Sequence, residues 1–386
     1  MHLYAFLKAK AAFAIDIQTS IGLGLFMLIM ILAPIIVRWS EKAGFESFAR
    51  MMSYIGYTWM GILFLFISVS LVIDFYRLIL YLAGLILKKD LSYLAVSNSY
   101  AFLIPLSLSI VIALYGYFEA KNIQTETIII KSPKISAEVG RLRIVQISDV
   151  HLGLIVREER LKRILQEVKK ANPDILISTG DLVDGQIDNL SGLSEMLREI
   201  NPRYGKFAIT GNHEFYAGLD QALNFTEKSG FRILRGEAVT IAGLVTIAGV
   251  DDPQVKTSGL LSGVPEKELL SGLPMESLTL LLKHRPVVDN NSKGLFDLQL
   301  SGHVHKGQIF PFSIITWLYY PTQAGLDISE SSKLYVSRGS GTWGPPIRFL
   351  SPPEVTVFEL VHANTQAIAE STGDDRIRGS PLLRGD

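Results

Sequence analysis

The sequence predicts two joined parts: an N-terminal α-helical bundle that spans a membrane, followed by an α/β domain built as a four-layer α/β/β/α sandwich with two mixed sheets. Residues 1–120 hold only 14 of the 74 charged residues (37 basic and 37 acidic) in the 386-residue chain. After residue 143, short apolar runs alternate with helical patterns, which is typical of α/β domains. The expected regions are transmembrane 1–120, linker or edge strand 121–142, α/β domain 143–361 and disordered tail 362–386.

Three apolar runs are long enough to cross a hydrocarbon core of about 30 Å, which takes about 20 residues of helix. A fourth run, Leu78–Leu87, has only ten residues and fits a short span, a re-entrant segment or an interfacial helix. The chain is therefore predicted to be a multi-pass protein of the cell membrane with three or four spans. The three long runs are Thr19–Val37, Tyr54–Ile73 and Tyr100–Phe118.

The number of spans decides which side of the membrane the α/β domain faces. With four spans, the basic residues on the side opposite the domain outnumber those on its own side, and the positive-inside rule places the domain outside the cytoplasm. The residues on that opposite side are Arg38, Lys42, Arg50, Lys88 and Lys89. With three spans the count is nearly balanced and the rule gives no answer.

Eight strands are predicted in the α/β domain from apolar runs bounded by turn-forming residues. Between the first two, apolar side chains repeat at helical spacing from Leu161 to Val168, so a βαβ unit with parallel strands is expected. The predicted strands are Arg143–Ile147, Asp174–Ser178, Lys206–Thr210, Leu244–Val250, Leu278–Lys283, Asp297–Leu300, Lys333–Val336 and Glu354–Leu360.

Chemically active side chains follow the ends of five of these strands. In open α/β sheets, ligands bind at the carboxyl ends of the strands, so these side chains are expected to converge on one place. Each block alone is weak evidence, because Asp, Asn and Gly also serve ordinary turns. The residues are Asp149 and His151, Asp181 and Asp184, Asn212 and His213, His284, and His303 and His305.

The donor types indicate metal ions. Carboxylate, amide and imidazole ligands suit manganese, iron or zinc, and a chain without cysteine has no thiolate sites or disulfides. Seven of these side chains acting as ligands are too many for one tetrahedral ion, whereas two ions about 3.5 to 4 Å apart that share a carboxylate would use all seven. Such a pair clamps a phosphoryl group, so the sequence predicts two divalent metal ions as cofactor and a phosphoester as substrate.

The order D-x-H, G-D-x-x-D, G-N-H-E, H and G-H-x-H resembles the calcineurin-like metallophosphoesterase superfamily over about residues 143–361. The resemblance implies hydrolysis of phosphomonoesters or phosphodiesters by a hydroxide held between two metals. It also implies that His213, oriented by Asp184, protonates the leaving oxygen or stabilises the transition state, and that Asp181 bridges the metals. The implied ligands are Asp149, His151 and His305 for the first metal, and Asn212, His284 and His303 for the second.

A late segment, Ser337–Phe349 (SRGSGTWGPPIRF), resembles a bacterial subfamily in which this domain follows transmembrane segments or an export signal. That resemblance implies a lipid-linked substrate such as UDP-2,3-diacylglucosamine. The alternatives are a nucleotide or phosphoprotein phosphatase, and a membrane receptor or scaffold without turnover. Gly185 and Gln186 stand where protein serine/threonine phosphatases carry arginine, which disfavours a phosphoprotein. The balanced charge predicts no nucleic-acid partner, and the oligomeric state is left open.

The apolar run Ile309–Leu326 follows the last two histidines. It fits a core strand and turn interrupted by prolines, or a loop beside the metals that leans on the membrane. Four further charged residues fit either phosphate contacts or surface and salt-bridge roles; they are Glu214, Arg285, Arg338 and Arg348.

Overall fold

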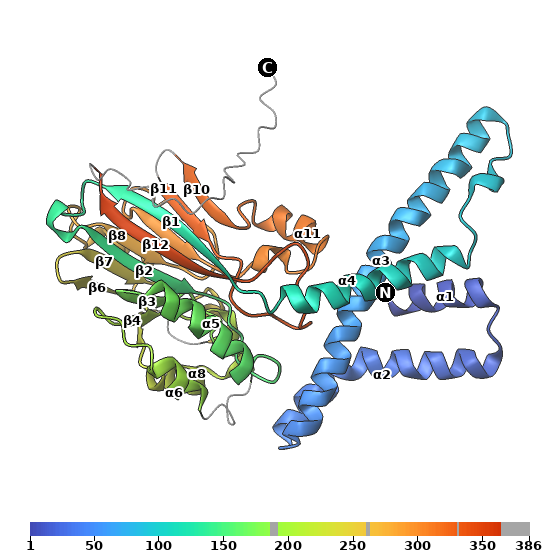
Figure 1. The fold of residues 1–386 in the computed structure, drawn as a ribbon, viewed down its shortest axis with the longest axis horizontal. Coiled ribbons are helices and arrows are strands. Elements are labelled where there is room, and N and C mark those ends of the chain that lie inside the picture. Colours follow the sequence, from blue (N-terminus) through green and yellow to red (C-terminus); the bar gives the residue numbers. More distant parts are fainter. Residues whose placement is uncertain (186–191, 260–262, 330–331, 364–386) are drawn as a thin grey trace.

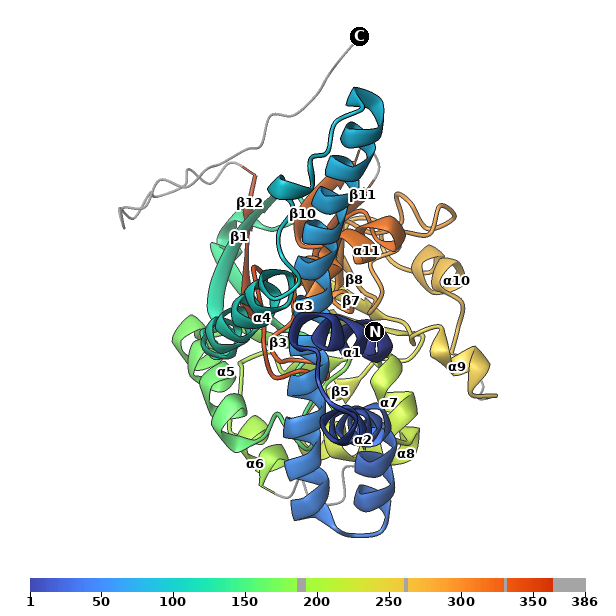
Figure 2. The same cartoon turned by 90° about the vertical axis from the view of Figure 1, so that its right-hand side faces the viewer.

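The chain folds into a group of long helices and a two-sheet domain, as Figures 1 and 2 show. The structure is a computed structural model that describes residues 1–185, 192–259, 263–329 and 332–363. The two parts and the two mixed sheets confirm the predicted fold class. The predicted disordered tail lies almost entirely outside the described residues.

Three helices are long and apolar enough to span a membrane: α2 (Ile17–Lys42), α3 (Glu46–Leu87) and α4 (Tyr100–Glu119). A shorter helix, α1 (His2–Phe13), precedes them, and the single turn η1 (Ser92–Leu94) lies between α3 and α4. Many large apolar side chains on these helices are exposed, as expected for surfaces that face lipid rather than water.

The fourth apolar run of the sequence is the C-terminal part of α3 and not a separate segment. Two charged residues, Asp74 and Arg77, interrupt the apolar sequence, but both have partners. Asp74 accepts a hydrogen bond from Lys8 Nζ at 2.7 Å, and Arg77 Nε donates to the carbonyl of Val96 at 3.0 Å. The described residues therefore contain three candidate spans, and α3 runs obliquely past α2 and α4 (Figure 1).

The α/β domain contains two six-stranded sheets. The first has the order β1-β12-β2-β3-β4-β5, and it is mixed because β12 is antiparallel to β2 while β2 to β5 are parallel. The second has the order β10-β11-β9-β8-β7-β6, with antiparallel pairs at both edges. The strands are β1 (Gln124–Ser132), β2 (Arg141–Ile147), β3 (Ile175–Ser178), β4 (Lys206–Ala208), β5 (Arg232–Ile233), β6 (Glu237–Ile241), β7 (Val245–Gly249), β8 (Thr279–Leu282), β9 (Leu298–Ser301), β10 (Gly325–Ser329), β11 (Ser332–Val336) and β12 (Glu354–His362).

Helices cover the outer faces of both sheets, and the main core lies between the sheets. Ile144 and Phe358 of the first sheet pack with Leu280 and Leu300 of the second in one buried cluster. On the outer face of the second sheet, Leu270 of α10 packs in another buried cluster. The domain helices and single turns are η2 (Ala137–Val139), α5 (Glu158–Ala171), α6 (Leu193–Arg198), α7 (Asn212–Ala217), α8 (Leu219–Lys228), α9 (Gln254–Thr257), α10 (Glu266–Ser271), η3 (His305–Gly307) and α11 (Phe312–Tyr319).

Helix α5 shows how the sequence builds the outer layer. Leu161, Ile164 and Val168 recur at helical spacing and are fully buried against the first sheet. Acidic residues occupy its first turn and basic residues its last, which complements the helix dipole. Asn172 ends the helix in the left-handed conformation (φ 47°).

All eight predicted strands are present, with ends that differ by three residues or fewer. The segment that fitted a linker or an edge strand forms β1, which pairs in parallel with β12 at the edge of the first sheet. The prediction omitted β5, β6 and β10. These are short or lie at sheet edges, where few apolar side chains mark them.

The apolar run after the last two histidines is neither a core strand nor a loop. Its centre forms α11, whose side chains remain exposed, among them Leu318 (70% exposed). The helix lies beside the membrane-spanning part: the ring of Phe312 packs edge-to-face against Phe64 of α3, with centroids 6.0 Å apart. Ile309, just before α11, is buried with Leu65 of α3 and Ala113 of α4.

Close backbone contacts attach the domain to the spanning helices. Arg348 N donates to the carbonyl of Gly116 in α4 at 2.9 Å. A Cβ at Gly116 would lie 2.6 Å from the carbonyl oxygen of Arg348, and one at Gly61 in α3 would lie 2.9 Å from Ile347 Cδ1. Tyr54 of α3 also donates to the carbonyl of Ile155 at 3.2 Å. These glycines let the helices and the domain approach closely.

Replacing Gly116 with alanine should lower the thermal stability of the detergent-solubilised protein, because the added methyl group collides with fixed backbone. Overpacking of this kind costs about 1–3 kcal/mol. Gly22→Ala in α2 is the matched control, since a Cβ there meets nothing within 4 Å. Thermal unfolding followed by size-exclusion chromatography measures both. A midpoint for Gly116→Ala equal to that for Gly22→Ala would contradict the close contact.

Candidate metal centre

The loops that follow β2 and β3 run side by side and bring the first two blocks together. Asp149 and His151 follow β2, and Asp181 follows β3. The backbone N–H of Asp149 donates to the carbonyl of Gly180 at 3.1 Å, and that of His151 donates to the carbonyl of Asp181 at 3.0 Å. Parallel pairing of β2 with β3 places both loops at the same edge of the sheet.

Five of the seven predicted ligands adopt a left-handed backbone conformation. Positive φ is uncommon for residues other than glycine, and such residues cluster at functional sites because the surrounding structure must hold them. The five are Asp149 (φ 50°), His151 (φ 55°), Asp181 (φ 52°), His303 (φ 74°) and His305 (φ 48°). The loops are therefore shaped to present these side chains.

Six of the predicted ligands form two adjacent groups, each with donor atoms within 4.8 Å of one another. Asp181 belongs to the second group and also faces the first: its Oδ2 is 3.2 Å from His284 Nε2 and 3.8 Å from His151 Nε2. One carboxylate thus reaches both sets of ligands. The first group is Asp149, His151 and His305, and the second is Asp181, His284 and His303.

The seventh predicted ligand, Asn212, opens α7 next to these groups. The backbone N–H of the following residue, His213, donates to Asp181 Oδ1 at 2.9 Å, which fixes the start of α7 against the shared carboxylate. Asn212 is buried, and its Oδ1 has no hydrogen-bond partner among the described residues. A buried acceptor without a donor is costly unless a cation or water satisfies it.

The donor arrangement fits bound cations. The Nε2 atoms of His151 and His305 are 3.0 Å apart, and His303 Nδ1 lies 3.2 Å from His284 Nε2. Two ring nitrogens at such a distance can share a proton, and in its place both can bind a cation. His284 Nδ1 donates to the carbonyl of Thr179 at 2.8 Å, which orients Nε2 toward the group.

Ionisation in the two groups is strongly shifted. Burial lowers the pKa of His284, but the charges of Asp181 and Asp149 outweigh it and raise the pKa to about 10. Burial and the charge of His284 lower the pKa of His303 to about 3. Burial would raise the pKa of Asp181, yet the nearby histidines, chiefly His284, hold it well below its ordinary value. Carboxylate charge therefore dominates around His284, as a cation site requires.

His213 and Asp184 lie beside these two groups and form a third group with His151, whose Nδ1 lies 3.8 Å from Asp184 Oδ1. His213 Nδ1 donates to Asp184 Oδ1 at 2.7 Å, which leaves Nε2 as the free ring nitrogen. Burial lowers the pKa of His213, but the hydrogen bond to Asp184 and the charge of Asp181 outweigh it and raise the pKa to about 9. His213 therefore carries a proton at neutral pH in this environment.

The four charged residues with open roles are all engaged inside the protein. Arg285 pairs with Asp252, and Arg338 pairs with Glu126 and Glu354. Arg285 and Arg338 therefore have the salt-bridge role. Glu214 and Arg348 have neither a phosphate-contact role nor a surface or salt-bridge role, because they are buried and bind backbone groups.

Glu214 and Arg348 hold the loops of the site in place. Glu214 accepts from the backbone N–H groups of Gly211, Asp181 and Leu182 at 2.7 to 3.0 Å. Arg348 donates to several backbone carbonyls of the loop around Gly341, and its Nη2 lies 3.0 Å from His305 Nδ1. Glu214 ends the G-N-H-E motif, and Arg348 lies in the segment Ser337–Phe349. The sequence around these two residues does not indicate that their side chains are buried.

Aromatic rings surround the site. Trp343 and Tyr216 lie 6.3 Å and 5.3 Å from His213 between ring centroids, and Tyr320 lies 5.4 Å from His303. Trp343 and Tyr216 are about half exposed. These residues were not predicted, although Trp343 and Tyr320 lie inside quoted segments.

Comparison with known proteins identifies the family. The calcineurin-like phosphoesterase family matches residues 142–307. An uncharacterized metallophosphoesterase of Aquifex aeolicus is 38% identical over 255 residues, which cover 66% of this chain and 97% of that protein. Another from Campylobacter jejuni is 33% identical over 345 residues, 84% of this chain and 87% of that protein.

A transmembrane protein with metallophosphoesterase domain from Danio rerio is 31% identical over 276 residues. The match covers 67% of this chain and 62% of that protein. The family match, the two bacterial relatives that are covered over 97% and 87% of their length, and the two His/Asp groups agree with one another. The chain therefore belongs to the metallophosphoesterases with a calcineurin-like phosphoesterase domain, and it is a metal-dependent phosphoester hydrolase.

Proposed function

We propose that this chain hydrolyses a phosphoester in a dinuclear centre at the membrane surface. The single observation that carries the proposal is the position of Asp181, whose carboxylate lies between two groups of donors. Asp149, His151 and His305 would hold one ion, and Asn212, His284 and His303 the other. The donor types fit manganese, iron or zinc.

Two divalent ions, when bound, would polarise the phosphoester and activate a water molecule for attack on phosphorus. The remaining chemistry is assigned to residues of the chain. His213 would donate a proton from Nε2 to the leaving oxygen, with Asp184 holding the ring through Nδ1. Bound cations would oppose the carboxylates that raise the pKa of His213, and so would bring it closer to neutrality, where a general acid is most effective.

The substrate is proposed to be lipid-linked, of the type of UDP-2,3-diacylglucosamine. Helix α11 begins at Phe312, seven residues after His305, and exposes large apolar side chains, including Ile314 (56%), Trp317 (56%) and Leu318 (70%). It packs on α3 through Phe312. An exposed apolar helix that joins the ligand loop to the membrane-spanning part supports an active site that takes its substrate from the bilayer.

The proposal predicts that α11 variants separate lipid from soluble substrates. Ile314→Ser with Leu318→Ser should lower the rate on a detergent-dispersed UDP-linked diacyl sugar by roughly thirtyfold or more, since each of the two exposed apolar side chains contributes about 1 kcal/mol or more to lipid contact. Hydrolysis of bis-p-nitrophenyl phosphate should not change. Met275→Ser, at an equally exposed position (58%) away from the site, is the control.

Three distinct outcomes would contradict the proposal. Equal loss on both substrates would show that α11 serves the fold and not lipid recognition. Faster turnover of nucleotides or phosphopeptides than of every lipid substrate, with Mn, Fe or Zn supplied, would assign the site to a soluble phosphatase. Absence of metal-dependent hydrolysis of any phosphoester would favour a receptor or scaffold.

The domain is further proposed to lie outside the cytoplasm. With three spans, the numbers of basic residues on the two sides of the membrane are nearly equal, so the side that the domain faces is tested by a direct measurement. The chain has no cysteine, which makes single-cysteine labelling clean. Lys293→Cys in the domain should react with a membrane-impermeant maleimide in intact cells, and Lys88→Cys after α3 should react only after permeabilisation. The reverse pattern would place the domain in the cytoplasm.

A further inference from the structure

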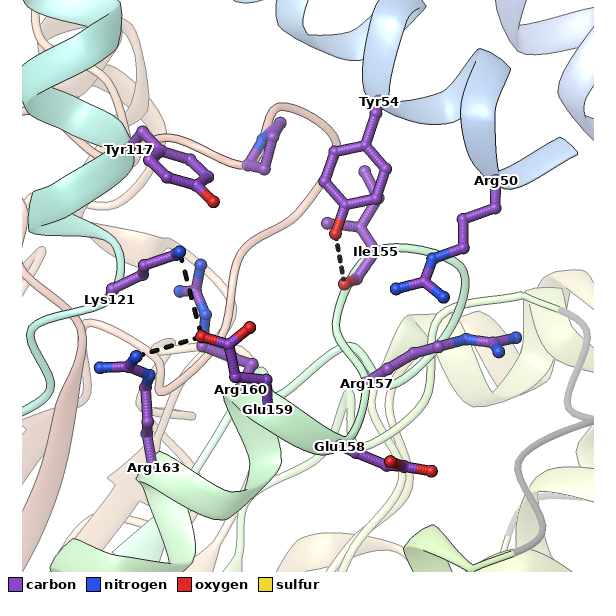
Figure 3. A pocket seen from close by; sticks show the side chains of 11 residues that line it. Arg50, Tyr54, Tyr117, Lys121, Ile155, Arg157, Glu158, Glu159, Arg160 and Arg163 are labelled. Atoms are coloured by element: carbon purple, nitrogen blue, oxygen red, sulfur yellow. Dashed lines mark hydrogen bonds and ion pairs between the residues drawn. The ribbon is translucent and has the colours of Figure 1, made fainter. Parts of the chain in front are cut away.

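A second polar site lies where the spanning helices meet the domain. A cavity of about 300 Å³ opens between the N-terminal part of α3, the end of α4 and the first turns of α5 (Figure 3). We call it the junction pocket. Its polar lining consists of Arg50, Tyr54, Tyr117, Lys121, the run Arg157–Arg160, and Arg163. None of the predicted metal ligands lines it.

The junction pocket carries an excess of positive charge. Five basic residues line it, against two carboxylates, Glu158 and Glu159. Glu159 is shared between two of the cations: it lies 3.1 Å from Arg163 and 4.0 Å from Lys121. A third cation, Arg157, pairs with Glu46 of α3, which is not among the lining residues. The lining itself therefore keeps a surplus of cations.

Arg160 is the most buried of these cations. It is 9% exposed, and its Nη1 donates to the carbonyl of Ala120 at the end of α4. Among the described residues it has no ion pair with a carboxylate within 4 Å. Burial lowers the pKa of Arg160 to about 10. A buried guanidinium held by a carbonyl alone leaves room for an anion that would complete its charge balance.

The pocket lies at the ends of two candidate membrane spans, where lipid headgroups are expected. Arg50 and Tyr54 lie near the start of α3 and Tyr117 near the end of α4, the ends of these helices that adjoin the domain. Tyrosine and basic side chains at span ends are typical of the membrane interface. Next to them, Met51 (51%) and Phe118 (67%) expose apolar side chains outside the pocket. A molecule in the pocket would thus have lipid beside it.

We propose that the junction pocket binds the phosphate of an anionic lipid headgroup. The cations would hold the phosphate, with Arg160 at the base, while the acyl chains lie along α3 and α4. Exposed apolar side chains on both helices favour a lipid over a soluble phosphate. The site is separate from the metal centre, so the proposal does not depend on hydrolysis.

The test is isothermal titration calorimetry, in which each probe is titrated into the full chain in uncharged detergent. The three probes are dihexanoyl phosphatidylglycerol, dihexanoyl phosphatidylcholine and inorganic phosphate. Phosphatidylglycerol should bind saturably and more tightly than either of the others. Phosphatidylcholine carries the same phosphate without net charge, and inorganic phosphate carries the charge without acyl chains.

Two kinds of variant change the charge of the pocket in opposite directions: one removes cations and the other removes a carboxylate. Lys121→Gln with Arg163→Gln should weaken phosphatidylglycerol binding on the order of tenfold or more, since each cation contributes about 1 kcal/mol toward an anionic lipid. Glu159→Gln should tighten it several-fold, which a merely structural role would not produce. Lys169→Gln with Lys170→Gln, at the other end of α5, is the matched control and should change nothing.

Three results would overturn the proposal. One is equal affinity of the wild type and the Lys121→Gln, Arg163→Gln variant. Another is failure of Glu159→Gln to tighten binding. The third is inorganic phosphate binding as tightly as phosphatidylglycerol with the same losses, which would make the pocket a site for a soluble anion. Lys121 and Arg163 are partly exposed (28% and 44% of the side chain), and thermal unfolding of each variant checks that the fold is kept.

Discussion

Replacing Asp181 with asparagine should abolish metal-dependent hydrolysis and remove both metal ions. The Asp181 carboxylate reaches donors of both groups, at 3.2 Å from His284 and 3.8 Å from His151. An amide keeps the shape but removes the charge that two divalent ions need. The metal ions stabilise the transition state by several kcal/mol, and loss of this stabilisation lowers kcat by roughly a thousandfold or more. Elemental analysis and hydrolysis of bis-p-nitrophenyl phosphate measure the two effects.

Asp174→Asn is the matched control for this experiment. Asp174 precedes β3 at its amino end and accepts from the backbone N–H of Arg143 at 2.8 Å, whereas Asp181 follows the carboxyl end of the same strand. The control should keep both ions and nearly full activity. Two ions per chain in Asp181→Asn, with unchanged activity, would refute the shared carboxylate.

The predicted site residues come together because their positions follow from strand direction. Parallel strands β2, β3 and β4 end at one edge, so side chains directly after them converge whatever the loops do. The sequence also shows which side chains follow each strand. It does not show burial or hydrogen bonds between loops, so the backbone-binding roles of Glu214 and Arg348 become visible only in the structure.

Elements at the edges and at the membrane were harder to predict. The apolar, β-branched and aromatic composition of Phe312–Tyr319 favours a strand by local propensity, yet the segment is a helix. Contacts at its N-terminal end accompany this outcome: Ile309, just before the helix, is buried with side chains of α3 and α4, and Phe312 packs on Phe64. Tertiary contact with a neighbouring part overrides propensity in a segment this short.

The length of α3 has a similar cause. The predicted runs Tyr54–Ile73 and Leu78–Leu87 are separated by Asp74 and Arg77, and charged residues are costly in a hydrocarbon core. Their partners come from other segments: Lys8 lies in α1, and the carbonyl of Val96 lies between η1 and α4. Pairing between segments distant in sequence keeps the helix continuous, and hydropathy along the chain does not reveal it.

His213→Ala should slow hydrolysis while leaving the metal content unchanged. His213 is next to a predicted ligand but outside the two groups around Asp181, and its ring is held by Asp184 at 2.7 Å. Loss of a general acid typically costs about a hundredfold to ten-thousandfold in rate. The loss should be greatest for alkyl phosphoesters, whose leaving oxygen needs a proton, and small for p-nitrophenyl esters, whose leaving group departs as a stable anion.

Asp184→Asn provides the companion measurement for His213→Ala. It removes the charge that orients His213 without removing the ring, so it should show the same dependence on the leaving group with a smaller loss. The slope of log kcat against leaving-group pKa is the quantity to compare among the wild type and both variants. If alkyl and nitrophenyl esters slow by the same factor in His213→Ala, the histidine stabilises the transition state or holds the substrate and does not deliver the proton.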